Sequence, residues 1–130
     1  MVAVKSFMVP REKFVTIERD TDVQTAARIM RDRGIGSLFV TNGKEVIGIL
    51  TDTDMVRRVV ATGADIHKTP VEQVMSAPIL TIEEDKTLLD ANDLMAKTHI
   101  RHLGVTQDGK LVGLISVRDL VLFLTNLPRK

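Results

Sequence analysis

The hydrophobic and polar positions of this chain follow one pattern twice. In each half, a short apolar run of strand type precedes apolar residues at helical spacing, and two more apolar runs and a second helical segment follow. Residues 16–55 align with residues 81–120 at a constant offset of 65 positions, without a gap. Because polar as well as apolar positions match, we expect a tandem repeat with a pseudo-twofold axis.

The predicted unit is α/β, with the element order β-α-β-β-α. Asp22 and Thr87 precede the helical segments and are residue types that cap helix N-termini. The dipeptides Asn42-Gly43 and Asp108-Gly109 predict hairpin turns, and they lie one position apart in the alignment, so we expect the two hairpins to differ by a bulge. The expected strands are residues 14–17, 38–40, 46–50, 79–82, 103–105 and 111–115, and the closing helices begin near Thr53 and Arg118.

The repeat sets the expected domain division. A short segment ending in methionine precedes each copy, at residues 4–8 and 71–75, and the polar, turn-forming residues 63–70 predict the linker. We therefore assign residues 1–66 to the first copy and residues 67–130 to the second. One copy of roughly sixty residues would be marginally stable alone, so we expect both to form one globular module.

Composition restricts the class of function. The formal net charge of +1 gives no electrostatic reason to expect a nucleic-acid or membrane partner. The chain has no cysteine, which excludes disulfides and thiolate metal sites and fits a cytoplasmic location. It also has no tryptophan or tyrosine on which nucleobases could stack. No apolar run approaches the ~20 residues that a membrane span needs.

The repeated polar residues lie where a strand is expected to run into a helix. The two sequences are Gly48-x-x-Thr51-x-x-Asp54 and Gly113-x-x-Ser116-x-x-Asp119, with aliphatic residues after each glycine. Hydroxyl and carboxylate side chains at this place often only cap the helix. The same geometry also offers N–H groups to a phosphate and a carboxylate to a ribose diol. Two copies at identical register favour ligand binding.

With these motifs, the chain resembles the CBS domain pair, also called a Bateman module. The resemblance covers about residues 4–126 and rests on the leading Val-x-x-x-Met segments, the Thr-Ile strand ends, the Ala-x-x-x-Met helices, the run at 100–106 and the two turns. It implies a non-catalytic regulatory module that binds an adenosine-containing ligand in the cleft between the copies. AMP, ADP or ATP is the first choice, S-adenosylmethionine or NAD the second. Energy sensing through an unknown partner protein would follow.

The resemblance implies two ligand sites, each drawing on both copies. In the first, Asp54 would hold the ribose hydroxyls and Arg101 the phosphate; in the second, Asp119 would take the place of Asp54. The first site has the basic pair Arg101 and His102, and Gly36 and Ser37 stand at the matching positions of the second site. We therefore expect the first site to bind more strongly. The first set is Ile49, Thr51, Thr53, Asp54, Pro78, Leu80, Ile100, Arg101 and His102. The second set is Lys13, Val15, Ile35, Gly36, Leu114, Ser116, Arg118 and Asp119.

Other signals indicate different classes of function but are incomplete. His99 and His102 lack the carboxylate or thiol partners of a metal site, so no metal is expected. No nucleophile–base pair, Walker loop or G-x-G-x-x-G motif supports an enzyme. Two alternatives stay open: a ligand-independent dimerisation adaptor, in which the repeated polar residues are only caps, and a nucleic-acid-binding regulator that uses Arg57 and Arg58.

The second closing helix contains an apolar run at residues 120–124. A helix that is apolar on every side is either buried deep in a small core or covered by a partner. We expect a disc-like homodimer, since twofold contacts are the commonest oligomer geometry. The contact would include Leu120, Val121, Phe123 and Leu124.

Overall fold

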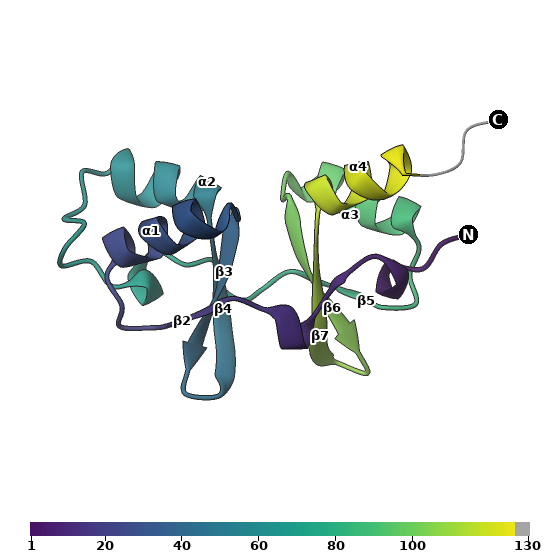
Figure 1. The fold of residues 1–130 in the computed structure, drawn as a ribbon, viewed down its shortest axis with the longest axis horizontal. Coiled ribbons are helices and arrows are strands. Elements are labelled where there is room, and N and C mark those ends of the chain that lie inside the picture. Colours follow the sequence, from purple (N-terminus) through teal and green to yellow (C-terminus); the bar gives the residue numbers. More distant parts are fainter. Residues whose placement is uncertain (127–130) are drawn as a thin grey trace. The chain divides into compact units, whose positions relative to one another are not determined.

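The computed structural model describes residues 1–126, and its backbone follows the order β-α-β-β-α twice (Figure 1). The first copy consists of β2 (Thr16–Glu18), α1 (Val23–Arg33), β3 (Ser37–Asn42), β4 (Glu45–Thr51), α2 (Asp52–Asp54) and the π-helix η3 (Met55–Val60). The second consists of β5 (Thr81–Glu83), α3 (Leu88–Thr98), β6 (His102–Gln107), β7 (Lys110–Ser116) and α4 (Val117–Thr125). Short elements precede the copies: η1 (Val4–Ser6), β1 (Val9–Pro10), η2 (Arg11–Lys13) and η4 (Val71–Gln73). The predicted α/β repeat is confirmed.

The chain packs into two units that do not coincide with the sequence halves. Val15–Ile79 form one unit, called here the first-copy unit. Met1–Phe14 join the described residues from Leu80 onward in the other, the second-copy unit. The leading segment at residues 4–8 therefore packs with the second copy, and the leading segment at residues 71–75 packs with the first copy. The division at residues 66 and 67 describes the repeated sequence and stays a prediction.

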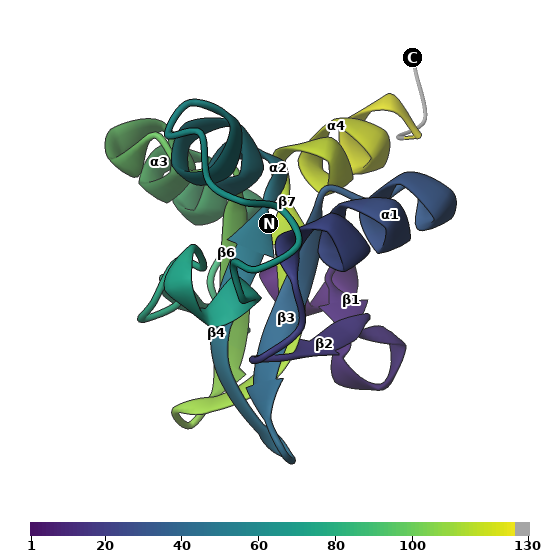
Figure 2. The ribbon, with the colours of Figure 1, turned by 90° about the vertical axis from the view of Figure 1, so that its left-hand side faces the viewer.

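Each unit contains one sheet, and the two hairpins have the same register. In the first-copy unit the order is β2-β3-β4, with β2 parallel and β4 antiparallel to β3; in the second-copy unit it is β1-β7-β6-β5. Both hairpins shift register at matching positions, Val40/Thr41 and Val105/Thr106. The expectation that they differ by a bulge is therefore wrong. Asn42 pairs with Glu45, which makes Gly43-Lys44 the turn. The turns lie at the ends of the hairpins away from the helices (Figures 1 and 2).

The leading segments contribute buried side chains to the units. Val4 is fully buried in the second-copy core, where its N–H donates to the Lys86 carbonyl at 2.7 Å. Val71 is equally buried in the first-copy core, and its N–H donates to the Thr21 carbonyl at 2.8 Å. In Figure 1 the N-terminal segment (purple) runs along the sheet of the second-copy unit. These segments are parts of the cores that they join.

Helix α4 is divided between a buried and an exposed face. Leu120 is buried in the core of its unit, and the ring of Phe123 lies 5.4 Å from that of Phe7, centroid to centroid. Val121 and Leu124, by contrast, are 52% and 51% exposed. Leu120 and Phe123 therefore serve their own unit, and of the residues expected in a dimer contact only Val121 and Leu124 are exposed. No helix among residues 1–126 is both long and apolar enough to cross a membrane.

Candidate functional site

The first candidate turn is a capping box at the junction of β4 and α2. Asp54 accepts hydrogen bonds at Oδ2 from the N–H of Thr51 (3.0 Å) and from its hydroxyl (3.1 Å). The Asp54 N–H in turn donates to the Thr51 hydroxyl oxygen at 3.2 Å. This reciprocal pattern satisfies N–H groups that would otherwise lack partners at the start of a helix. The motif expected from the sequence is present with its hydroxyl and carboxylate in contact.

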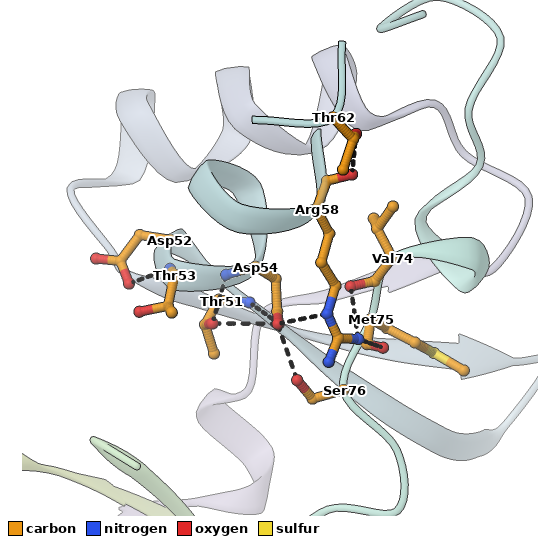
Figure 3. A network of polar contacts seen from close by, with 9 residues as sticks. All are labelled: Thr51, Asp52, Thr53, Asp54, Arg58, Thr62, Val74, Met75 and Ser76. Carbon is orange, nitrogen blue, oxygen red and sulfur yellow. Dashed lines mark hydrogen bonds and ion pairs between the residues drawn. The ribbon is translucent and has the colours of Figure 1, made fainter. Parts of the chain in front are cut away.

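The second carboxylate oxygen of Asp54 has partners of its own (Figure 3). The Ser76 hydroxyl donates to Oδ1 at 2.9 Å, and the Arg58 Nε lies 3.8 Å from the same oxygen. Arg58 also donates to the carbonyl of Met75 at 2.8 Å. Asp54 is only 5% exposed, so its carboxylate is buried, and both of its oxygens accept hydrogen bonds. The turn is thereby tied to the segment that follows η4.

The second candidate turn repeats the capping box but not these additional contacts. Asp119 accepts at Oδ2 from the N–H and hydroxyl of Ser116 at 2.9 and 3.0 Å, and its N–H donates to the Ser116 hydroxyl oxygen at 3.2 Å. Its side chain is half-buried. Among residues 1–126, no group donates to Oδ1 of Asp119. The two turns therefore share the capping box at Oδ2 and differ in the contacts to Oδ1.

The difference follows from which residues occupy matching places. Ser76 bridges to Ile49 on β4, and Val9 pairs with Leu114 at the corresponding place on β7. Valine has no hydroxyl to donate. Arg58 follows Asp54 by four positions, and Phe123 follows Asp119 by four. The second turn therefore has a valine and a phenylalanine where the first has a serine and an arginine.

Each turn is also joined to the loop before the central strand of its own unit. The Asp52 N–H donates to the Gly36 carbonyl, and the Val117 N–H donates to the Arg101 carbonyl, both at 3.0 Å. Arg101 therefore lies beside the start of α4, in the same unit as Asp119. An open hollow of about 320 Å³ adjoins this place. Its lining residues are Asn92, Met95, Ala96, His99, Ile100, Arg101 and Val117.

The remaining predicted site residues divide between the two units. Val15 and Ile35 are half-buried and pack against the first-copy core, while Leu80 does the same in the second-copy core. Pro78 is exposed and follows a cis peptide bond. The first-copy unit holds Ile49, Thr51, Thr53, Asp54 and Pro78, with Val15, Ile35 and Gly36. The second-copy unit holds Leu80, Ile100, Arg101 and His102, with Lys13, Leu114, Ser116, Arg118 and Asp119.

Sequence reasoning missed two residues that contact a predicted site residue. From the sequence, Arg58 was considered only in the nucleic-acid alternative, and Ser76 received no role. The spacing of Asp54 and Arg58 is a signal that was available, since side chains four apart meet on a helix. Ser76 is far from Asp54 in sequence and reaches it only through the bridge to Ile49. No group of three or more potential metal ligands gathers within the described part of the chain.

Comparisons with known proteins agree on one family. The sequence model of the CBS domain matches residues 4–61 and again residues 71–126. The CBS domain-containing protein YhcV of Bacillus subtilis is 33% identical over 122 residues, which are 94% of this chain and 85% of that protein. An uncharacterized protein of Methanopyrus kandleri is 38% identical over 104 residues, and the match spans 78% of this chain and about half (53%) of that protein.

A solved structure shares the fold over nearly the whole chain. It is that of an uncharacterized conserved protein from Pyrococcus horikoshii, with a TM-score of 0.87 and 28% identity. The match covers 99% of this chain and 96% of the other.

Proposed function

This chain belongs to the CBS domain family, and on that premise we propose that it is a non-catalytic regulatory module that binds an adenine nucleotide and signals to a partner protein. The observation that carries the proposal is the turn built twice, with a hydroxyl and a carboxylate held in the same capping geometry by Thr51 and Asp54 and by Ser116 and Asp119. A carboxylate at a helix start is suited to accept hydrogen bonds from a ribose diol, and neighbouring N–H groups are suited to a phosphate.

A protein of the same fold has been solved with an adenine nucleotide, and it guides the choice of ligands to test. CBSX2, solved in complex with AMP, has a TM-score of 0.78 to this chain and 22% identity, a likeness that bears on the fold alone. AMP, ADP and ATP are therefore the first ligands to test, followed by S-adenosylmethionine and NAD. Binding would change the conformation that a partner detects only if the ligand has a higher affinity for one conformation of the protein than for another.

The proposed assembly is a homodimer through the exposed face of α4. Val121 and Leu124 present apolar surface there, and their burial by a second copy would remove it from water. Val121→Asp together with Leu124→Asp should convert a dimer into a monomer in analytical ultracentrifugation. A dimer that persists would move the contact elsewhere. The regulated partner and the cytoplasmic location stay predictions.

Isothermal titration tests the proposed function directly. The purified protein is titrated with AMP, ADP, ATP, S-adenosylmethionine and NADH, and affinity and stoichiometry are read together. We expect saturable binding of an adenine nucleotide, lost when Asp54→Ala and Asp119→Ala are combined. Absence of heat from all five, with the protein folded and dimeric, would leave the ligand-independent adaptor. Salt-steep binding to DNA or RNA would instead favour the nucleic-acid regulator.

A further inference from the structure

We propose that Ser76 and Arg58 compete with a ligand for the Asp54 carboxylate, because both contact its Oδ1. The turn that contains Asp119 would therefore bind the ribose diol more tightly and fill first. This inference rests on the proposed function and assigns an order to its two turns. It makes Ser76 and Arg58 residues that determine which turn is filled. The proposed order is the reverse of the order expected from the basic pair Arg101 and His102.

Three of the roughly four acceptor positions of the Asp54 carboxylate are already used within its own unit. A carboxylate has two oxygens with about four lone-pair positions. Oδ2 accepts from the N–H and hydroxyl of Thr51, and Oδ1 accepts from the Ser76 hydroxyl, with the Arg58 guanidinium 3.8 Å away. The side chain is also buried. A ribose diol that donates two hydrogen bonds to Asp54 would therefore have to displace a bond that the protein already makes, and the Ser76 hydroxyl is the partner from outside the turn.

The carboxylate of Asp119 meets no such competition among residues 1–126. Its Oδ2 accepts from Ser116, as in the first turn, while Oδ1 accepts no hydrogen bond from the residues that the structure describes. Val9 and Phe123 occupy the places of Ser76 and Arg58, and their side chains have no hydrogen-bond donor. The half-buried side chain also keeps part of its surface open. A diol could therefore bind without breaking a protein hydrogen bond.

The difference in affinity between the two turns can be estimated from the hydrogen bond that a ligand must displace at Asp54. Losing a hydrogen bond to a charged group weakens an interaction by an amount that corresponds to about tenfold or more in affinity. At Asp54 the hydrogen bond from the ligand replaces the one from Ser76, so the net change in hydrogen-bond free energy is small. At Asp119 the hydrogen bond from the ligand is added without such a loss. We therefore expect the two turns to differ in Kd by about tenfold.

Single-site variants identify which turn fills. The experiment uses isothermal titration of the full chain with AMP, ADP and ATP as probes, on the wild type, Asp54→Asn and Asp119→Asn. We expect Asp119→Asn to remove the tighter binding step and Asp54→Asn to remove the weaker one. The converse result, or equal losses in both variants, would overturn this inference while the proposed function stands. No binding of any probe to the wild type would overturn the proposed function itself.

The chain also supplies matched variants that test the cause. Ser76→Val combined with Arg58→Phe gives the first turn the residues of the second, and should tighten the weaker step by about tenfold. Ser76→Ala is the smaller change, used alongside because it leaves the packing of Arg58 intact. Val9→Ser is the control in the other turn. If both changes at Ser76 leave the weaker step unaltered in a protein with wild-type circular dichroism, Ser76 does not restrict the site.

Discussion

Gly48 lies directly beneath the thioether of Met75. A Cβ built on Gly48 would come within 2.5 Å of the Met75 Sδ and 3.0 Å of the Ser76 carbonyl oxygen. Gly113 has the same relationship to Met8, with the Val9 carbonyl oxygen 3.1 Å from its built Cβ. Two separate signals of the sequence, the glycine of each turn motif and the methionine of each leading segment, are therefore two sides of one contact.

Gly48→Ala is expected to lower the free energy of unfolding by about 1–3 kcal/mol, because the added methyl overpacks a contact that includes backbone. Urea denaturation at constant pH measures the change. The double variant with Met75→Ala removes the sulfur but leaves the Ser76 carbonyl, so the two effects should be less than additive. A single variant as stable as the wild type would show that the strand and the Met75 segment separate easily.

Val4→Ala should destabilise the second-copy unit, although Val4 lies far from the rest of that unit in sequence. The side chain is 0% exposed, and its truncation is expected to lower the free energy of unfolding by about 1–3 kcal/mol. Val121→Ala is the matched control on the exposed face of α4, with an expected change within about 0.5 kcal/mol in the monomer. Equal effects of the two variants in urea denaturation would contradict the placement of Val4.

The carboxyl of Glu18 predicts a dependence of stability on pH. The Gly43 N–H (2.8 Å) and the Thr41 hydroxyl (2.9 Å) both donate to it, and these bonds hold the pKa of Glu18 below its ordinary value of 4.5. Because the folded-state pKa is the lower one, the stabilisation is fully present above about pH 5 and is lost as pH falls through the folded-state pKa.

Glu18→Gln removes this titration. The free energies of unfolding of wild type and variant should differ most near neutral pH and converge in acid, as measured by urea denaturation at several pH values. Glu45→Gln, at an exposed position of the β3–β4 hairpin that Glu18 contacts, serves as the control. A difference between wild type and Glu18→Gln that is constant with pH would mean that the carboxylate does not hold the turn.

Thr87→Ala tests the cap of α3. The Thr87 hydroxyl oxygen accepts from the Asp90 N–H at 3.2 Å, and the Asp90 carboxylate accepts from the Thr87 N–H at 2.9 Å. Loss of the hydroxyl should lower the free energy of unfolding by about 1 kcal/mol. Thr87→Ser keeps the oxygen and should restore most of the stability in thermal denaturation. Equal melting temperatures for all three proteins would show that the cap contributes little.

Local signals predicted most of the fold because the residues concerned act on their own neighbours. Asp22 and Thr87 cap α1 and α3 as expected, with side chains that accept from N–H groups three positions ahead. The first hairpin shows where such reasoning fails. Asn42-Gly43 is a strong turn signal, but Asn42 is needed in the ladder opposite Glu45, and the turn moves on to Gly43-Lys44. The matching registers of the two hairpins, rather than the dipeptide, place the turn.

The candidate site was predictable only as far as its residues are neighbours in sequence. Thr51 with Asp54, and Ser116 with Asp119, form the expected capping boxes within one helical turn. The contact of Ser76 with Asp54 depends on the bridge that brings residue 76 alongside β4, which no local pattern encodes. The repeat itself concealed this contact, because alignment of the copies emphasises what they share and the contact exists in one of them.

The split composition of the second-copy unit sets an order of events during synthesis. Val15–Ile79 form a unit from consecutive residues, so every contact partner has been translated once Ile79 has left the ribosome. Met1–Phe14 are translated before this unit, yet Val4 and Phe7 pack against residues that are translated after it. Residues 1–14 must therefore wait, with apolar side chains uncovered, until the residues from Leu80 onward emerge. Residues 1–14 are therefore translated before the first-copy unit but pack after it.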